Sequence, residues 1–392
     1  MRRVFVLVLD SLGVGALPDA DDFGDAGCHT LDHLVQSAGG LDVPHLIAAG
    51  LGHVPGVSSV SKVAPPDLPT GAVGRMAERS PGKDTSTGHW EMMGCPLEHA
   101  FPVFPAGFPA VFLDEWLART GLPGWLGNEP ASGTEIIERL GAEHLRSGRP
   151  IVYTSADSVF QVAAHTDRLD LERLYEVCRV ARELLEPMGV ARVIARPFVG
   201  ELGSFRRTYD RRDYSLPPPQ ETSLERLVAA GLPVIGVGKI SDIFAGRGIT
   251  HAVHTEGNED GMQHTLALGD SVETGLVFVN LVDFDMLYGH RRDALGYRRA
   301  LERFDPALGE LLTKLREDDL LLLTADHGND PTCQRGTDHT REYVPLMALG
   351  PAVRGGVELG TRDTFADLGA TVEEALGLEP QRPGRSFLGE VL

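Results

Sequence analysis

Residues 1–10, MRRVFVLVLD, contain the stretch that decides the fold class, an unbroken apolar run from Val4 to Leu9 that ends at Asp10. A run of this kind is typical of a strand in a parallel sheet that is covered on both faces. Similar runs occur at Pro233–Val237, Leu276–Val282, Leu320–Thr324 and Val344–Leu349. Helical stretches such as Tyr297–Arg316 lie between the later runs. This alternation predicts an α/β core with a doubly wound, mostly parallel sheet.

The middle of the chain has a different character. Residues 96–130 are rich in Pro, Gly and Phe and show little periodicity. Beyond them the pattern predicts helices and strands in mixed order, at Thr134–Leu145 (helix), Ile151–Thr154 (strand), Leu171–Leu185 (helix) and Ala191–Val199 (strand). This mixture favours an α+β insertion.

Three consecutive prolines, Pro217–Pro219, mark the end of that insertion. Directly after them, Thr222 and Glu225 form a capping-box pattern that opens a new helix. We therefore expect the chain to return to the core at this point. The expected division is a core of residues 1–95 and 220–392 with an inserted domain at 96–219.

Composition excludes several classes of protein. The 36 basic and 56 acidic residues give a net charge of −20, which disfavours general binding to nucleic acid. No stretch approaches 18 apolar residues, so we expect no membrane span. The short apolar run before Asp10 has no small-residue cleavage site after it, so a signal peptide is not expected either. The four cysteines form no CxxC pair, which disfavours a zinc knuckle or redox motif. These features together favour a cytoplasmic protein.

Acidic residues follow three of the predicted core strands, and histidines lie close behind them. The set consists of Asp10, Asp283, Asp285, His290, Asp326, His327 and His339. A single acid after a strand is ordinarily a turn former or a helix cap. In an open α/β sheet, however, the carboxyl ends of the strands form the ligand crevice, where residues distant in sequence converge. Oxygen and imidazole ligands suit divalent cations, so the set predicts a site for two metal ions. On spacing alone, Asp283 can take the place of Asp285.

A second candidate site is GKDTSTGHWE at residues 82–91. It places three hydroxyls, Thr85, Ser86 and Thr87, beside Lys83, one of only four lysines in the chain. Such hydroxyls ordinarily cap a helix. The functional alternative is a nucleophile whose pKa is lowered by a bound divalent ion. The residue pattern does not choose among the three hydroxyls.

The inserted segment also carries basic residues, which form a third candidate feature. They are Arg196, Arg206, Arg207, Arg211 and Arg212. Lys239 in VGKISD adds a further cation, and guanidinium groups match phosphate geometry. The alternative for most members of such a run is solvated surface charge. Asp157 in YTSADS follows a predicted strand and can accept hydrogen bonds from sugar hydroxyls, or serve as a cap or turn.

At these residues the chain resembles the prokaryotic-type phosphopentomutases of the alkaline phosphatase superfamily. The metal motifs alone would indicate only the superfamily, whereas the nucleophile and insertion motifs are more specific. The resemblance covers essentially the whole chain, in VLDSLGVGALPDA (8–20), GKDTSTGHWEMMG (82–94), SGTEII (132–137), YTSADSVFQVAAHT (153–166), IARPFVGE (194–201), VGKISDIF (237–244), NLVDFDMLYGHRRD (280–293), TADHGNDPT (324–332) and GTDHTREYVP (336–345).

This resemblance implies a core of alkaline-phosphatase type that binds two Mn²⁺ ions, or other divalent ions, with an inserted cap domain. It selects Thr85 as the phosphorylated residue and a ligand of the metals. It assigns the other metal ligands to Asp10, Asp285, His290, Asp326, His327 and His339. It points to Arg196, Arg207, Arg211 and Lys239 for substrate phosphate, and to Asp157 for the sugar.

The reaction implied by the resemblance interconverts ribose 1-phosphate and ribose 5-phosphate, and likewise the 2-deoxyribose pair. It runs through a phosphothreonine and a sugar bisphosphate, which also primes the enzyme as an activator. The alternatives are a metal-dependent phosphohydrolase, a mutase for another substrate such as phosphoglycerate, and a non-catalytic metal-binding scaffold. The insertion motifs TSADS and IARPFVGE favour the phosphopentomutase reaction over the hydrolase and the other mutase. A scaffold would need neither the Thr85 hydroxyl nor the arginines of the insertion.

Overall fold

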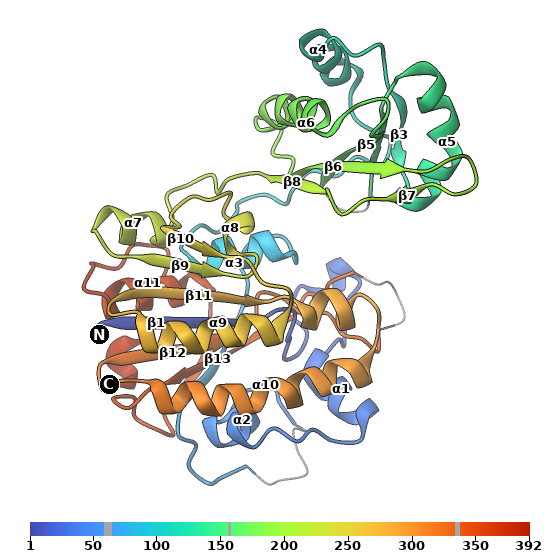
Figure 1. Cartoon of the computed structure of the whole chain (residues 1–392). Coiled ribbons are helices and arrows are strands. Elements are labelled where there is room, and N and C mark those ends of the chain that lie inside the picture. The colour runs from blue at the N-terminus through green and yellow to red at the C-terminus, as the bar shows by residue number, and fades with distance from the viewer. Residues whose placement is uncertain (59–64, 156–157, 334–337) are drawn as a thin grey trace. The chain divides into compact units, whose positions relative to one another are not determined.

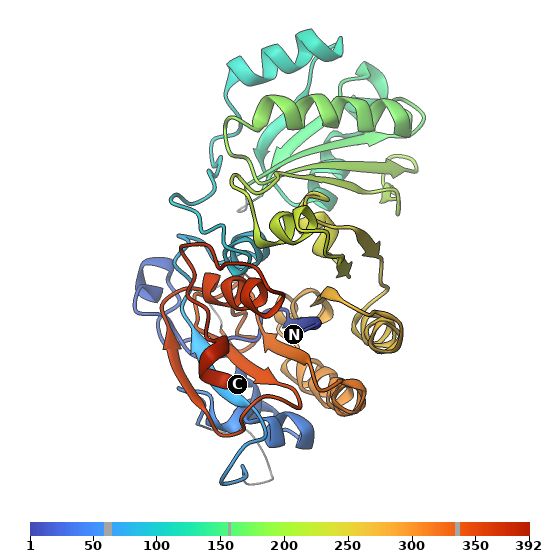
Figure 2. The ribbon, with the colours of Figure 1, turned by 90° about the vertical axis from the view of Figure 1, so that its left-hand side faces the viewer.

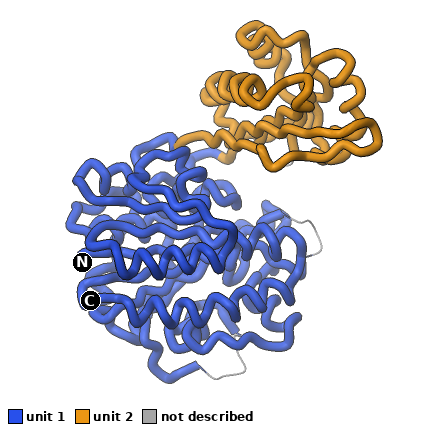
Figure 3. Tube along the Cα trace, in the orientation of Figure 1, with its two compact units in different colours: residues 1–99, 218–392 blue, residues 100–217 orange. Residues whose placement is uncertain are grey.

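The computed structural model describes residues 1–58, 65–155, 158–333 and 338–392 (Figure 1). The chain divides into two compact units (Figure 3). Unit 1 consists of Met1–His99 and Pro218–Leu392, and unit 2 is the intervening segment Ala100–Pro217. Among the described residues, no helix has the length and apolar character needed to cross a membrane.

Unit 1 is built on a mixed, mostly parallel sheet. Over the described residues its strand order is β10 (His251–Val253), β9 (Val234–Val237), β11 (Gly275–Leu281), β1 (Arg3–Leu9), β12 (Asp319–Thr324), β13 (Val344–Leu349), β2 (Ala72–Met76) and β14 (Glu358–Arg362). The central strands β1, β11 and β12 are buried along their whole length, as their unbroken apolar runs require. The predicted α/β class is therefore confirmed. The exception to parallel pairing is β13, which is antiparallel to both β12 and β2.

Helices cover both faces of this sheet (Figures 1 and 2). On one face α10 (Ala294–Lys314) packs against α9 (Asn258–Ser271), α1 (Thr30–Ala38) and α2 (Pro44–Ala49). On the other, α11 (Ala366–Ala375) packs against α3 (Thr85–Met92) and α7 (Ser223–Ala229). Short helices α8 (Ile240–Ile243) and α12 (Leu388–Val391) complete the unit. The predicted capping box at Thr222 and Glu225 is present at the start of α7.

Unit 2 has its own sheet. The strand order is β3 (Leu126–Pro130), β4 (Ile151–Thr154), β5 (Val159–His165), β6 (Arg192–Val199) and β7 (Arg206–Arg207), and β8 (Arg212–Ser215) also pairs with β6. Helices α4 (Ala110–Thr120) and α6 (Leu171–Leu185) contact each other and share one apolar core with the sheet. Helix α5 (Gly133–Ser147) contacts β4 and β5 through a second core on the other face. Cys178 of α6 is fully buried in the first of these cores.

Residues 96–130 contain regular structure although their sequence shows little periodicity. This stretch contains α4 and β3. Phe112, Leu113 and Trp116 form the buried stripe of α4, and the helix runs only from the N-cap Pro109 to the C-cap Gly121. Because the helix is short and is flanked by prolines and glycines, its period is hidden among residues that break helices.

Candidate functional site

The three central strands of unit 1 end together at one edge of the sheet. Their register pairs Leu9 of β1 with Leu281 of β11, and Val8 of β1 with Thr324 of β12. Asp10 therefore follows β1 at the level where the loops after β11 and β12 begin. Parallel pairing is the reason that residues so distant in sequence meet at this edge.

The first group of potential ligands consists of Asp10, Asp326 and His327. Each offers one ligand atom, and these atoms lie within 4.8 Å of one another. All three side chains are buried. Asp10 Oδ1 lies 3.6 Å from His327 Nε2. This is the spacing that a shared cation between carboxylate and imidazole needs.

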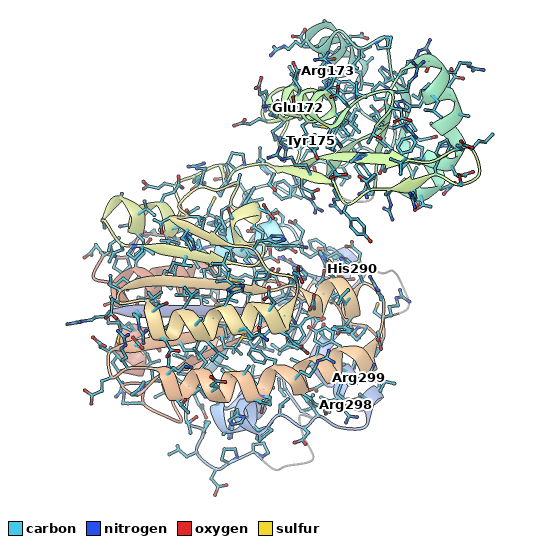
Figure 4. The ribbon with its side chains drawn as sticks, in the orientation of Figure 1. Glu172, Arg173, Tyr175, His290, Arg298 and Arg299 are labelled. Carbon is cyan, nitrogen blue, oxygen red and sulfur yellow. The ribbon has the colours of Figure 1, made fainter. Side chains whose placement is uncertain are left out.

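The second group consists of Asp285 and His339, with His327 shared between the two groups. His290, which directly follows the short helical segment Phe284–Gly289 (Figure 4), joins it: its Nε2 lies 3.1 Å from Asp285 Oδ2 and 3.2 Å from His339 Nε2. Burial by itself raises the pKa of Asp285, but His339 and His290 outweigh that effect and hold this pKa well below its usual range. His339 is fixed in turn through Nδ1, which lies 2.9 Å from the Lys83 carbonyl oxygen.

The charge distribution of the cluster fits bound cations. Asp10 Oδ1 and Asp326 Oδ2 are buried and form no hydrogen bond with any described residue. Burial, and then the nearby carboxylates of Asp326 and Asp285, raise the pKa of Asp10 well above its usual value. The nearest imidazole nitrogen to both oxygens is His327 Nε2, at 3.6 Å from Asp10 and 3.2 Å from Asp326. Buried carboxylate oxygens that accept no hydrogen bond are costly, and a metal ion bound by these oxygens would offset that cost. The oxygen and imidazole donors suit divalent cations.

Asp283 has a different role from Asp285. Its Oδ2 accepts a hydrogen bond of 2.8 Å from the Asn258 backbone N–H at the start of α9. Its own N–H donates to Asn258 Oδ1 over 2.9 Å. The geometry thus makes Asp283 a helix-capping residue and leaves Asp285 in the cluster, a choice that spacing alone did not make.

The hydroxyls at the start of α3 are separated by the structure. The N-cap is Asp84, whose side chain accepts from the N–H groups of Ser86 and Thr87. The Asp84 backbone N–H donates to Thr87 Oγ1 over 3.3 Å, which completes a capping box, and Thr87 Oγ1 itself donates to the Asp84 carbonyl over 2.8 Å. Thr85 Oγ1 instead lies 3.2 Å from His327 Nε2. Of these three hydroxyls, only that of Thr85 contacts a residue of the two ligand groups described above, namely His327.

Helix α3 is tightly fixed on the loop that carries the cluster. A Cβ atom at Gly88 would lie 2.1 Å from the Asp326 carbonyl oxygen, so only glycine allows this approach. At the other end of the helix, the buried carboxylate of Glu91 accepts hydrogen bonds from the backbone N–H groups of Ser80 (2.7 Å) and Phe365 (3.0 Å). These contacts set the position of Thr85 relative to the strand-end residues.

Comparison with known proteins extends over the whole chain. Residues 2–380 match a family model described as the metalloenzyme superfamily. A phosphopentomutase of Anaeromyxobacter dehalogenans (strain 2CP-1 / ATCC BAA-258) is 61% identical over 391 residues, covering 100% of this chain and 99% of the relative. A phosphopentomutase of Symbiobacterium thermophilum is 55% identical over 393 residues, with 100% and 99% covered. The chain belongs to the phosphopentomutase family.

The phosphopentomutase resemblance of the sequence motifs is thereby confirmed, and the chain is an isomerase of the intramolecular phosphotransferase class. A solved structure of a Leishmania mexicana phosphoglycerate mutase aligns with a TM-score of 0.49 at 14% identity, over 98% of this chain and 97% of that one. That likeness is too distant to assign an activity.

Sequence reasoning missed the residues that orient the acidic side chains of this phosphopentomutase-family site. Asn280 Nδ2 donates to Asp10 Oδ2 over 2.8 Å, and Asn329 Nδ2 donates to Asp285 Oδ1 over 2.7 Å. The only signals were an asparagine in the otherwise apolar strand GLVFVNL and another in ADHGND. A polar residue in a buried run is a fair indicator of a neighbour that needs a hydrogen bond.

The candidate phosphate-binding residues divide between the two units. Unit 2 contributes three of them, on or beside β6, β7 and β8: Arg196, Arg207 and Arg211. Burial raises the pKa of Tyr153 on β4, and the positive charges of these three arginines oppose that effect. Lys239 is an exposed residue of unit 1, directly after β9 at the start of α8. Asp157, the candidate sugar-binding residue, lies outside the described residues.

Proposed function

We propose that this chain interconverts ribose 1-phosphate and ribose 5-phosphate, and the corresponding 2-deoxyribose pair, through a phosphothreonine at position 85. The observation that carries the proposal is the placement of Thr85 Oγ1 at 3.2 Å from His327, at the edge of the buried acidic cluster. The naming of full-length relatives as phosphopentomutases supports the same reaction.

We further propose that the two ligand groups hold two divalent cations, with Mn²⁺ as the expected metal. The proposed ligands are Asp10, Thr85, Asp285, His290, Asp326, His327 and His339. The buried carboxylate oxygens without hydrogen bonds, and the raised pKa of Asp10, support this assignment. Bound divalent cations would lower the pKa of the threonine hydroxyl and neutralise charge on the transferred phosphoryl group.

The chain's own residues account for the remaining steps. The free hydroxyl of the sugar phosphate attacks the phosphorus of phosphothreonine 85 and loses its proton. The bond from phosphorus to Thr85 Oγ1 breaks, Thr85 Oγ1 gains a proton, and the sugar becomes a bisphosphate. The bisphosphate then presents its other phosphate to Thr85 Oγ1; the bond from phosphorus to the sugar oxygen breaks, and this oxygen becomes the free hydroxyl of the product. Each cycle regenerates the phosphoenzyme, and a sugar bisphosphate activator would prime it. Helix α3, held by Gly88 and Glu91, keeps the threonine oxygen in place for both transfers.

Arginines of unit 2 are the proposed partners of the substrate's phosphate. The candidates are Arg196, Arg207, Arg211 and, from unit 1, Lys239. Asp157 is the proposed partner of a sugar hydroxyl. In this proposal unit 2 serves as a cap domain and excludes water that would hydrolyse the phosphothreonine. The cytoplasmic location expected from the sequence stays a prediction.

Product analysis tests the proposed function. The protein is incubated with ribose 5-phosphate, MnCl₂ and a sugar bisphosphate. The expected product is ribose 1-phosphate. Free phosphate as the main product would indicate a hydrolase, and the absence of both products would contradict the proposed reaction. Intact-mass measurement after incubation with the bisphosphate should show one added phosphate, mapped to Thr85.

A further inference from the structure

Among the arginines of unit 2 proposed to bind phosphate, Arg196 is held in place by a buried neighbour. Arg196 lies on β6, and its Nε and Nη2 both donate to Gln161 Oε1 of the neighbouring strand β5, over 3.2 and 2.9 Å. Gln161 is buried, with 6% of its surface exposed. The amide oxygen therefore fixes the direction of the guanidinium group from inside the unit.

The partner of Arg196 differs in charge from the partner of Arg211. Arg211 donates two hydrogen bonds, of 2.7 and 2.6 Å, to the carboxylate of Asp213, which compensates its positive charge. Gln161 carries no charge, so its hydrogen bonds orient Arg196 without compensating it. Burial lowers the pKa of Arg196, and Arg211 and Arg207 add to that effect; Tyr153 and Asp213 oppose it without reversing it. Arg196 is thus a half-buried cation in a place that favours an anion.

Two further groups beside Arg196 also favour an anion. Tyr153 Oη is buried and donates no hydrogen bond to a described residue; burial raises its pKa, and the neighbouring Arg196 opposes that effect. A Cβ atom at Gly133, the first residue of α5, would lie 2.6 Å from that oxygen and 3.5 Å from Arg196 Cδ. The N-cap of α5, Ser132, makes no capping hydrogen bond through its side chain. A hydroxyl donor and the amino end of a 15-residue helix therefore adjoin the guanidinium group.

We propose that Gln161 is a positioning residue that directs Arg196 toward a phosphate of the sugar phosphate, and that the neutrality of its amide keeps Arg196 available for that phosphate. The inference rests on the proposed function and deepens it. It identifies Arg196, and not the carboxylate-paired Arg211, as the principal phosphate-binding guanidinium of unit 2.

The decisive variant is Gln161→Glu, which keeps the shape and the acceptor but adds a negative charge. If Gln161 only supported the fold, glutamate would hold Arg196 at least as well. If the uncompensated charge matters, the new carboxylate competes with the substrate. The KM for ribose 5-phosphate should then rise about 10- to 100-fold, the range expected for loss of a charge-assisted hydrogen bond, with a much smaller change in kcat. A wild-type KM in a folded Gln161→Glu enzyme overturns the inference.

A double-mutant cycle separates this inference from the proposed function. Arg196→Ala should itself raise the KM, and adding Gln161→Glu to it should have little further effect, because glutamate acts through Arg196. If Arg196→Ala leaves the KM unchanged, the proposed phosphate contact fails. If Arg196→Ala raises the KM and Gln161→Glu does not, only the inference fails. Should Gln161→Glu not fold, Gln161→Met decides: a raised KM supports the positioning role, and a wild-type KM overturns it.

Discussion

The acidic cluster of unit 1 and the arginine group of unit 2 are built in opposite ways. In the cluster, Asp10 and Asp326 follow the ends of buried strands closely, so the backbone of the sheet determines where their short side chains lie. In the arginine group, long side chains extend from the strands of unit 2, and Arg207 and Arg211 are exposed. The positions of Arg196 and Arg211 depend on one partner each, Gln161 for Arg196 and Asp213 for Arg211.

This difference predicts which kind of substitution should impair each site. A site that is fixed by sheet topology should lose its function when a ligand atom is removed, while the fold persists. A site fixed by side-chain partners should instead respond to the charge of those partners.

Replacing the proposed nucleophile should abolish the mutase cycle. Thr85→Val keeps the shape of the side chain but removes the oxygen that accepts the phosphoryl group. Activity should fall by at least about 1,000-fold, as for other nucleophile removals. Thr87→Val is the matched control, because it loses only a helix-capping hydroxyl and should cost about 0.5–2 kcal/mol of stability. Interconversion at a normal rate in Thr85→Val would contradict the phosphothreonine mechanism.

The second prediction separates metal binding from folding. Asp10→Asn should lose metal and most activity, yet the metal-free variant should be at least as stable as metal-free wild type, because one of three crowded carboxylates loses its charge. Thermal unfolding with and without a chelator measures this. Removing metal should lower the Tm of wild type and leave that of Asp10→Asn nearly unchanged. Equal metal content in the two proteins would contradict the ligand role of Asp10.

The contrast between the sites also explains what the sequence predicted. Apolar runs located the core strands, and the residues after them formed the acidic cluster, because parallel strands end at a common edge. The choice between Asp283 and Asp285 depended on a contact with Asn258, 25 residues away, which no local pattern contains. The partners of Asp10 and Asp285 were missed for the same reason.

The sequence identified the arginines of unit 2 as candidates but did not show which of them is free to bind a phosphate. Composition indicated that basic residues gather in the insertion, but the charge of the partner decides which of them can bind a phosphate. Asp213 lies two residues from Arg211, whereas Gln161 lies 35 residues from Arg196 on another strand. The second pairing follows from strand register, which the sequence does not show.

The third prediction tests how firmly α3 is fixed on the cluster. Gly88→Ala would place a methyl group 2.1 Å from the Asp326 carbonyl oxygen, so the helix must shift. Such overpacking should cost about 1–3 kcal/mol of stability. Activity should fall more than stability, because the shift moves Thr85 away from His327. The matched control is Gly389→Ala in α12, where a Cβ meets no atom within 4 Å and should leave both quantities unchanged. A wild-type Tm and rate in Gly88→Ala would show that the contact is not restrictive.

The smallest effect is expected at Arg211, although it lies in the same group as Arg196. Its charge is already compensated by Asp213, so Arg211→Ala removes little positive potential and should raise the KM for ribose 5-phosphate less than Arg196→Ala does. Arg207→Ala should fall between the two, since Arg207 is exposed but no carboxylate is bound to it among the described hydrogen bonds and ion pairs. The Tm should barely change in Arg211→Ala, because an exposed pair contributes about 0–1 kcal/mol. Steady-state kinetics of the three variants side by side gives the order. If Arg211→Ala raises the KM as much as Arg196→Ala, substrate must displace Asp213 from Arg211, and compensation by a carboxylate would then not protect a guanidinium from the substrate.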